Sequence, residues 1–359
     1  MTTARDVAEK LGVSTSTVGR ALADDPRISE STRARVVKAA REMGYVANHA
    51  ARLIRGAASD TVAVVVPDIS NGFYATIAHA LSGVFLRHGL QMMLGESADD
   101  PGVELRHVRA MAASRVAGAL IVPTARPTAE TVRLLATFPH VQMLRRAAGL
   151  SEVWFGIDDE HAVQQATQHL VDLGHRRIAF IGGSADLSTG AARIRGYQRA
   201  LAAADLDQDP DLIRLGAPAS GDLGPTALRV LLGAADPPTS VVCGSVQVTR
   251  SLLEEIRRLA ISVPSGLGVV GFGDEPGWSW WGPGLSTVSL PTEQLAVSSA
   301  LWLINHISQG LSTTDVRPYS STAAGTLVVR GSATDAAARP VGSMAPAVGA
   351  RIAKESASA

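Results

Sequence analysis

The pattern of hydrophobic and polar positions changes near residue 60. In residues 1–59, apolar side chains recur three or four positions apart in three short stretches, which is the spacing of amphipathic helices. From residue 60 to 332, apolar runs such as TVAVVV alternate with amphipathic stretches such as FYATIAHALSGVFLRHG. The alternation restarts at Asp158, which predicts two lobes, each with a parallel doubly wound sheet. We therefore expect an all-α head followed by a two-lobed α/β body.

Two helices separated by a short glycine-containing turn are predicted at the start of the head. Thr3 and Asp6 form a capping-box pattern, and Gly12 is expected to end the first helix. Ser14 is the expected N-cap of a second helix over Thr15–Ala23. This arrangement is a helix-turn-helix, whose second helix enters the major groove in DNA-binding proteins. A three-helix module without a nucleic-acid role is the alternative.

A third helix is predicted over Glu30–Met43. Ser29 is its expected N-cap, and Gly44 stands just past its end. The side chains of this helix that we expect to face inward are Val36, Val37, Ala40 and Met43. The three helices would then enclose one small core.

The exposed positions of the second helix carry side chains suited to DNA. Short hydroxyls let the helix approach base edges and phosphates, and an arginine such as Arg20 can bond guanine through two N–H groups. Residues 1–59 hold ten Lys and Arg against six Asp and Glu, although the formal net charge of the whole chain is zero. A basic head on an acidic body favours local contact with phosphates. The head residues expected to contact DNA are Thr3, Thr15, Ser16, Thr17, Arg20, Arg27 and Thr32.

The segment TARDVAEKLGVSTSTVGRALADDPRISESTRARVVKAAREMGY resembles the DNA-binding head of the LacI (lactose-repressor) family of bacterial transcription factors. Its DVA, GVS, TV-x-R-x-L, S-x-x-TR-x-RV and GY elements stand in the order and spacing of that family. Gly19 stands where the family often has Ser. The resemblance implies a ligand-responsive, allosteric transcriptional regulator, more specifically a repressor. It also implies that the protein binds a pseudo-palindromic operator as a homodimer, with a tetramer as the alternative.

Residues 45–59 join the head to the body. Asn48 can cap a short helix over about residues 48–56, which Gly56 would end. About two helical turns are marginal alone in water, so we expect this helix to form only when it docks. A plain linker is the alternative that composition alone leaves open.

The segment YVANHAARLIRG is similar to the hinge helix of the LacI family, in which the two hinge helices of a dimer enter the minor groove. Position matching puts Ile54 at the apolar wedge that kinks the DNA, with Leu53 beside it as the alternative. Ala47 stands where the family usually has Pro. The resemblance also implies DNA contacts for Asn48 and Ala51.

The resemblance extends through the body to about Arg330. VPDISNGFY is similar to the family's first strand-loop-helix, and DDEHAVQQATQHLVDLGHRRIAFIGG is similar to the start of its second lobe. The family's body is like that of periplasmic sugar-binding proteins, in which the chain crosses three times between the lobes. This implies a first lobe of about residues 60–158 and 288–317, and a second lobe of about residues 159–287 and 318–332.

Ligands of open α/β sheets bind at the carboxyl ends of the strands, so we expect the effector in the cleft between the lobes. Arg193 matches the arginine with which family members hold effector hydroxyls or carboxylates, and a guanidinium suits either group. Phe73 and Tyr74 would form an aromatic wall, with ordinary helix packing as the alternative. The residues expected to bind the effector are Asp68, Phe73, Tyr74, Ser97, Thr124, Arg193, Ser245, Asp274, Trp280 and Trp281.

The predicted cleft departs from that of the sugar-binding family members at two places. Ser245 and Val246 stand where those members usually carry Asn-Asp, and Gly273 stands where they usually carry Asp. Both changes remove acceptors for sugar hydroxyls. Three tryptophans follow within Trp278–Trp281, either bordering the cleft or packing in a core. We therefore expect a small carboxylate, a sugar acid or a partly apolar ligand, with a neutral sugar as the alternative.

No sequence pattern indicates catalysis, a metal site or a cofactor. Gly266–Gly271 matches G-x-G-x-x-G, but the motif is itself strand-like and no helix pattern follows it. The nine histidines lack metal-ligand spacing, and no G-x-S-x-G occurs. The lone Cys243 suits a reducing cytoplasm. We expect a cytoplasmic regulator, not an enzyme, whose partners are operator DNA, a small-molecule effector and a second copy of the chain.

A solute-binding protein is the rival class for a body of this kind. The N-terminus MTTARDVAEK lacks the apolar stretch of a signal peptide and opens a DNA-binding head, which argues against that class. No apolar run approaches the roughly 20 residues that cross a bilayer, so we expect no membrane contact. Residues 333–359 are rich in Ala, Ser and Pro without periodicity, which predicts a disordered tail.

Overall fold

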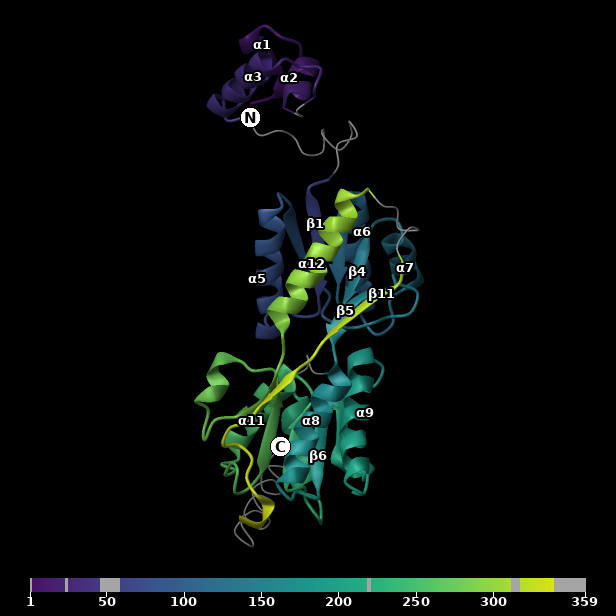
Figure 1. The fold of residues 1–359 in the computed structure, drawn as a ribbon, viewed down its shortest axis with the longest axis vertical. Coiled ribbons are helices and arrows are strands. Elements are labelled where there is room, and N and C mark those ends of the chain that lie inside the picture. Colours follow the sequence, from purple (N-terminus) through teal and green to yellow (C-terminus); the bar gives the residue numbers. More distant parts are fainter. Residues whose placement is uncertain (1, 23–24, 46–58, 218–220, 311–316, 339–359) are drawn as a thin grey trace, which may run out of the picture. The chain divides into compact units, whose positions relative to one another are not determined.

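The computed structural model describes residues 2–22, 25–45, 59–217, 221–310 and 317–338. Its chain forms two compact units, Met1–Ser59 and Asp60–Ala359. In its described residues the first unit forms helices and no strand, and the second unit contains two sheets with helices on both faces, which confirms the predicted fold class (Figure 1). Within the described residues, no helix is long and apolar enough to cross a membrane.

The head contains α1 (Ala4–Leu11), α2 (Thr15–Ala21) and α3 (Glu30–Glu42). The predicted capping box is confirmed, because the Thr3 hydroxyl accepts from the Asp6 N–H and the Asp6 carboxylate accepts from the Thr3 N–H. Gly12 ends α1 with a φ of 66°, a conformation that favours glycine. The hydroxyls of the predicted N-caps of α2 and α3 also accept from backbone N–H groups in the first turn.

The head core is built from apolar side chains of all three helices, with Val7, Val18 and Val36 fully buried. The prediction that Val37 faces inward is wrong, because this side chain is 44% exposed. Helix α3 packs on the core through Val36, Ala39 and Ala40. Successive residues of a helix are about 100° apart around its axis, so Val37 points away from the core side of Val36.

The first lobe of the body contains one six-stranded, wholly parallel sheet with the order β11-β5-β4-β3-β1-β2. Its strands are β1 (Thr61–Val66), β2 (Gln91–Glu96), β3 (Gly118–Ile121), β4 (His140–Met143), β5 (Val153–Ile157) and β11 (Tyr319–Ala323). Its helices are α5 (Gly72–Arg87), α6 (Pro101–Ala113), α7 (Ala129–Leu135) and α12 (Thr292–Ser308). Helices α5 and α12 lie side by side on one face of the sheet, and α6 and α7 cover the other face (Figure 1).

The second lobe contains a six-stranded sheet with the order β12-β10-β9-β8-β6-β7, in which β12 alone runs antiparallel to its neighbour. Its strands are β6 (Ile178–Gly183), β7 (Ile213–Gly216), β8 (Ser240–Cys243), β9 (Gly268–Phe272), β10 (Ser286–Ser289) and β12 (Thr326–Val328). Its α-helices are α8 (Asp159–Asp172), α9 (Ser188–Ala203), α10 (Leu223–Leu232) and α11 (Val246–Arg258). Helices α8 and α9 pack on one face, and α10 and α11 pack on the other.

The chain passes between the lobes three times in the described residues: from β5 to α8, from β10 to α12, and from β11 to β12. The predicted position of the third crossing is wrong. We expected residues 318–332 in the second lobe, but β11 pairs in parallel with β5 at the edge of the first sheet. Its sequence YSSTA is polar and half-exposed at this edge, so it lacks the apolar run that marks the other strands.

The predicted start of the disordered tail is also wrong. Just before the predicted start, Ser332 is buried and its hydroxyl donates to the Val269 carbonyl over 2.6 Å. Within the predicted tail, the Thr334 carbonyl lies 3.2 Å from a ring nitrogen of His175. The Ala336 N–H donates to the Leu173 carbonyl, and residues 336–338 form a short 3₁₀ helix. These contacts use backbone groups and a hydroxyl, which leave no hydrophobic periodicity in the sequence. Residues 339–359 lie outside the described residues.

One buried carboxylate joins the two helices on one face of the second lobe. Glu255 of α11 is 4% exposed and accepts from Arg229 of α10 over 2.7 Å and from Arg258 over 2.8 Å. The hydrogen bonds from Arg258 and then Arg229 lower the pKa of Glu255 from 4.5 to about 2. The stabilisation from this carboxylate is therefore complete above pH 4.5 and is lost as the pH falls through about 2.

We predict that Glu255→Gln lowers the free energy of unfolding by about 1.5–3 kcal/mol at pH 7, the usual range for hydrogen bonds to a charged group. Urea unfolding at several pH values measures the loss, and its difference from wild type should shrink between pH 4.5 and about 2. The exposed neighbour Glu254 provides the control, since Glu254→Gln should cost little. A constant difference between wild type and Glu255→Gln over that pH range would contradict the prediction.

Candidate functional site

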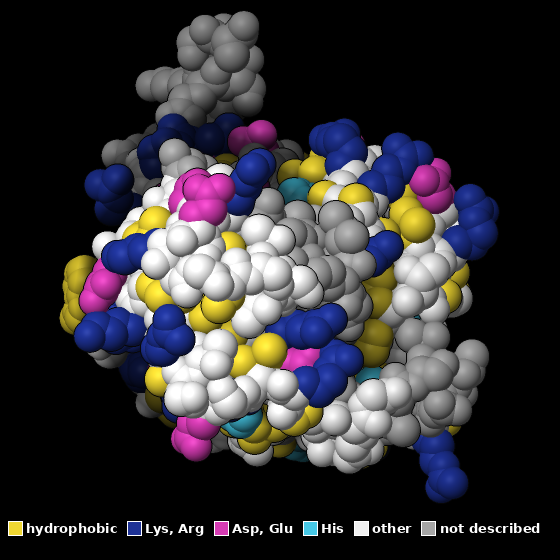
Figure 2. Space-filling view, turned by 90° about the horizontal axis from the view of Figure 1, so that it is seen from above, with side chains coloured by type: hydrophobic (Ala, Val, Ile, Leu, Met, Phe, Trp, Pro, Cys, Tyr) yellow, Lys and Arg dark blue, Asp and Glu magenta, His cyan; other side chains and the backbone are white. Residues whose placement is uncertain are grey.

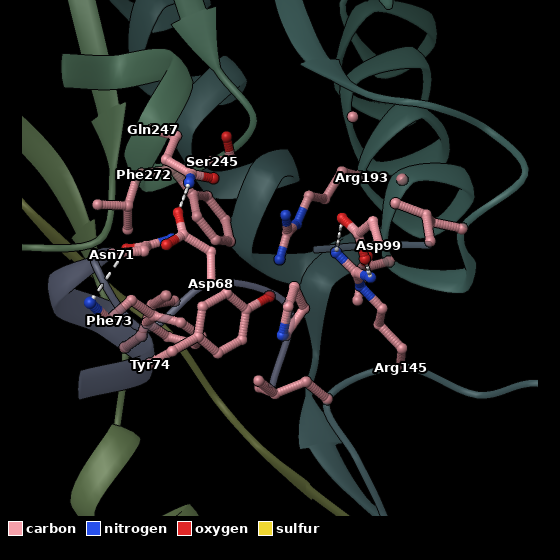
Figure 3. Close-up of a pocket in the computed structure, with 18 residues that line it drawn as sticks. Asp68, Asn71, Phe73, Tyr74, Asp99, Arg145, Arg193, Ser245, Gln247 and Phe272 are labelled. Carbon is pink, nitrogen blue, oxygen red and sulfur yellow. Dashed lines mark hydrogen bonds and ion pairs between the residues drawn. The ribbon is translucent and has the colours of Figure 1, made fainter. Parts of the chain in front are cut away.

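A cavity that is partly open to solvent lies between the two lobes of the body (Figure 3). The loops that line it follow the carboxyl ends of β1, β2 and β4 in the first lobe and of β6, β8 and β9 in the second. Parallel sheets collect their binding loops at this edge. Phe73 packs against the hydrophobic clusters of both lobes, so the floor of the cavity belongs to both.

The first-lobe wall combines an aromatic pair with two charged side chains. The rings of Phe73 and Tyr74, in the first turn of α5, meet edge to face with centroids 5.2 Å apart. Burial raises the pKa of Tyr74, so its hydroxyl stays protonated and able to donate. Beside it, Arg145 and Asp99 form an ion pair and both line the cavity (Figure 3).

The second-lobe wall is organised around Arg193 of α9. Its Nε donates to Asp159 over 2.7 Å, its Nη1 donates to the Gly244 carbonyl over 2.7 Å, and its guanidinium lies 4.2 Å from the centre of the Phe272 ring. Burial raises the pKa of Asp159, and the adjacent guanidinium opposes that shift. The start of α9 lies close to the preceding loop at Gly190, where an added Cβ would be 2.0 Å from the Ser184 carbonyl oxygen.

The charges of the cavity do not favour an anion. Each of its two guanidiniums, those of Arg145 and Arg193, already holds a carboxylate. Asp68 adds a second carboxylate to the lining, next to that of Asp99, whereas Asp159 lies behind Arg193. The two guanidiniums are therefore already balanced by carboxylates, and the cavity is suited to ligands that both donate and accept hydrogen bonds.

Hydrogen bonds cross from one lobe to the other at the rim of the cavity. The Gln247 amide in the second lobe donates to Asp68 in the first over 2.5 Å (Figure 3). The Arg146 N–H donates to the Ser188 hydroxyl over 2.8 Å. Because Asp68 also lines the cavity, a ligand that bonds its carboxylate would change a contact that holds the lobes in this arrangement.

The structure brings half of the predicted effector residues to the cavity: Asp68, Phe73, Tyr74, Arg193 and Ser245. Ser97 and Thr124 lie beneath the wall and are buried. Thr124 is bound through its N–H and its hydroxyl to the buried carboxylate of Glu104, over 2.7 and 3.1 Å. Neither predicted residue lines the cavity.

The loop after β9 also leads its predicted residues away from the cavity. Gly273 has a φ of 84° and turns the chain, and Asp274 is held by Arg330 over 2.8 and 2.9 Å. Trp280 is 78% exposed, and Trp281 packs against the hydrophobic cluster of the second lobe. Core packing, the alternative for these tryptophans, holds for Trp281 and for the buried Trp278.

Several residues that line the cavity were missed by sequence reasoning. They include Asn71, Asp99, Leu144, Arg145, Gln247, Phe272 and Leu290. Asp99, Arg145 and Phe272 stand at or just after strand ends, so the rule that located Asp68 would have included them. The pairing of Asp99 with Arg145 joins positions 46 residues apart and leaves no local signal.

The second candidate surface is that of α2 in the head. Thr15, Ser16 and Arg20 are exposed, and the Thr17 hydroxyl lies 2.8 Å from that of the N-cap Ser14. Figure 2 shows Lys and Arg side chains spread over one face of the molecule, with Asp and Glu side chains among them. The exposed Arg20 and hydroxyls of α2 suit contact with a polyanion.

The other predicted DNA contacts have different surroundings. Arg27 is 73% exposed but is bound by Asp25 over 2.6 Å, and this guanidinium lowers the pKa of the Asp25 carboxyl. Thr3 and Thr32 are at the N-terminal ends of α1 and α3. The predicted contacts Asn48, Ala51, Leu53 and Ile54 lie outside the described residues.

Two family models match the chain. Residues 3–48 match bacterial regulatory proteins of the lacI family, and residues 167–333 match a periplasmic binding protein-like domain. The chain is 29% identical to the HTH-type transcriptional repressor CytR of Escherichia coli (strain K12) over 336 residues, covering 92% of this chain and 96% of that protein. It is 32% identical to the HTH-type transcriptional regulator CelR of Thermobifida fusca over 321 residues, covering 87% and 93%.

Solved structures show the same likeness. The transcriptional regulator CelR in complex with cellobiose has a TM-score of 0.67 and 28% identity, covering 92% of this chain and 100% of that one. The Lac repressor dimer bound to operator and the anti-inducer ONPF has a TM-score of 0.76 and 22% identity, covering 93% and 99%. At that identity the second likeness concerns the fold alone.

The burial of Asp159 yields a prediction for stability. We expect Arg193→Ala to lower the free energy of unfolding by about 3–5 kcal/mol, because it leaves a buried carboxylate without its partner. Denaturant unfolding measures the loss. Arg195→Ala is the matched control, since Arg195 is on the same helix but is 59% exposed and pairs with Glu160, a type of pair that contributes about 0.2–1 kcal/mol. Equal losses in the two variants would show that the buried pair contributes no more to the free energy of unfolding than the exposed pair does.

Proposed function

We propose that this chain, which belongs to the LacI family of bacterial regulatory proteins, represses transcription. It would do so by binding a pseudo-palindromic operator as a dimer. Membership makes it a transcriptional regulator with a helix-turn-helix head and a periplasmic-binding-protein-like body. The observation that carries the regulatory part of the proposal is the cavity between the lobes, whose wall residue Asp68 is hydrogen-bonded across the cleft to Gln247.

The DNA-binding part of the proposal assigns base contacts to α2. Arg20, Thr15 and Ser16 are its exposed polar residues, and each chain supplies one such helix. Two chains related by a two-fold axis would therefore read two half-sites of opposite orientation. The proposed dimer is consistent with the Lac repressor dimer, whose fold the chain shares.

The effector part of the proposal is a small neutral molecule rich in hydroxyls, in place of the carboxylate expected from the sequence. Both guanidiniums of the cavity are already neutralised by carboxylates, so an added anion would gain little and would meet Asp68. Phe73, Tyr74 and Phe272 provide apolar surface for the less polar face of a sugar ring. The transcriptional regulator CelR in the solved complex with cellobiose is 28% identical to this chain, which supports a neutral sugar.

The proposed link between effector and operator is the arrangement of the lobes. A ligand that bonds both walls, or competes with Gln247 for Asp68, would favour one arrangement over another. Its effect on operator affinity cannot exceed its preference between the two arrangements, commonly a factor of roughly 5–150.

The proposed base contact of Arg20 is tested with DNA from the region upstream of the gene that encodes this protein. We expect Arg20→Ala to weaken operator binding by about 1–3 kcal/mol relative to scrambled DNA, the usual worth of a bidentate contact to a base. Fluorescence anisotropy at fixed salt measures both affinities. Arg41→Ala, in α3, removes the same charge and should weaken both DNAs alike. If Arg20→Ala also weakens both alike, Arg20 contacts phosphate and does not read the sequence.

The effector class is tested by thermal unfolding with neutral sugars and their acids. We expect glucose, ribose, cellobiose or a related neutral sugar to raise the melting temperature of the full-length protein, since a ligand that binds only the native state stabilises it. The same sugar should change operator affinity in anisotropy. Gluconate and glucuronate, at equal ionic strength, should do neither. Stabilisation by the sugar acids alone would support an anionic effector and contradict the proposed neutral one.

A further inference from the structure

The loops that carry Asp99 and Arg145 adopt a backbone conformation that most residues avoid. In the described part of the chain, six residues other than glycine have positive φ angles. Three of them, Arg115, Asp205 and Ala260, directly follow helix ends, where the left-handed conformation is common. The other three are Ala98, Asp99 and Leu144, with φ angles of 51°, 57° and 64°.

These three residues are either members of the Asp99–Arg145 pair or its direct neighbours in the chain. Unfavourable backbone conformations persist only where surrounding contacts enforce them, and they gather at binding sites. Here the Ala98 N–H donates to the Pro67 carbonyl and the Leu144 N–H donates to the Phe155 carbonyl, so both loops are fixed to the sheet. The backbone therefore holds Asp99 against Arg145 independently of any ligand.

Both members of the pair line the ligand space, and Asp99 is the more exposed of the two. Arg145 is 8% exposed, and its guanidinium contacts both carboxylate oxygens of Asp99. The Asp99 side chain is 30% exposed and lines the cavity. On the opposite wall, Asp159 is 5% exposed and is not part of the lining, so it lies behind Arg193. Of the two carboxylates that hold these guanidiniums, Asp99 is thus the one that lines the cavity, and it lies beside Arg145 (Figure 3).

We propose that Asp99 sets the charge selectivity of the effector cleft, acting as a built-in anion that satisfies Arg145 and so excludes anionic ligands. The inference rests on the proposed function of the cleft as the effector site. A guanidinium donates to a carboxylate or to a sulfate in the same bidentate geometry, so only one of them can occupy the Nη1–Nη2 edge of Arg145 at a time. With Asp99 in place, the pair presents a donor and an acceptor side by side, which matches neighbouring hydroxyls of a neutral ligand. Without Asp99, the same wall becomes an anion site.

Inorganic sulfate tests this directly, because it needs no knowledge of the natural effector. Sulfate is titrated into full-length Asp99→Asn at constant ionic strength, and binding is followed by calorimetry and thermal unfolding. Asn tolerates a positive φ better than most residues, so this variant keeps the loop conformation. We expect Asp99→Asn to bind sulfate about tenfold or more tightly than wild type, since it gains a charge-assisted bidentate contact. The double variant Asp99→Asn/Arg145→Gln should lose the gain.

A matched control comes from the exposed pair of Arg109 and Glu130, which is also bidentate, at 2.7 Å for both contacts. Glu130→Gln frees a guanidinium outside the cleft and should bind sulfate no better than wild type. Asp99→Gly, which also accommodates a positive φ, takes the place of Asp99→Asn if the latter folds poorly.

The proposal is overturned if both Asp99 variants bind sulfate with the affinity of wild type. It is also overturned if Glu130→Gln gains as much sulfate affinity as the Asp99 variants do. It is equally overturned if both variants are destabilised and sulfate restores neither. These results are independent of the regulatory assignment, because DNA is absent from the measurement. Sugars that leave operator binding unchanged would contradict the proposed function while leaving the sulfate result intact.

Discussion

A parallel sheet brings the carboxyl ends of all its strands to one edge, and in this body both sheets turn that edge toward the same cleft. The constraint explains why the cavity is lined by residues that are far apart in the sequence. Asp68 follows β1, Asp99 follows β2, Arg145 follows β4 and Ser245 follows β8. Each is fixed by the register of its strand, so the walls are positioned by the sheets and not by the flexible parts of the loops.

Burial of charge imposes a second condition on this cleft. A guanidinium that is removed from water needs a hydrogen-bonding anion, and the structure supplies one to Arg145 and another to Arg193. The carboxylates that pair with the guanidiniums determine which hydrogen-bonding groups remain available to a ligand in the cavity. A wall of matched donors and acceptors favours hydroxyl groups, whereas a wall of free guanidiniums would favour carboxylates. The sequence displays the arginines but does not display their pairing, which is why the sequence alone suggests an anionic effector whereas the paired arginines support the neutral one that we propose.

Local signals were sufficient for the head and for most of the alternation in the body. The capping pattern at Thr3, the glycine after α1 and the apolar strand runs each act within a few residues, so the sequence alone indicates them. The failures have a different origin. β11 is held by pairing with β5 some 160 residues away and is too polar to be recognised. The tryptophan loop was placed by composition, but the turn at Gly273 directs it away from the cavity. Long-range pairing and the direction of a single turn have no periodic signature.

The three crossings between the lobes have a consequence for biosynthesis. Leu295, Ala300 and Leu303 of α12 complete the hydrophobic core on one face of the first sheet. They are translated only after α8 to β10 of the second lobe, so that face of the sheet is covered only in part, by α5, until almost the whole chain has emerged from the ribosome. The first lobe cannot finish folding before the second is made. The nascent chain therefore exposes an apolar surface for most of its synthesis, and a truncation before α12 would leave a product prone to aggregation.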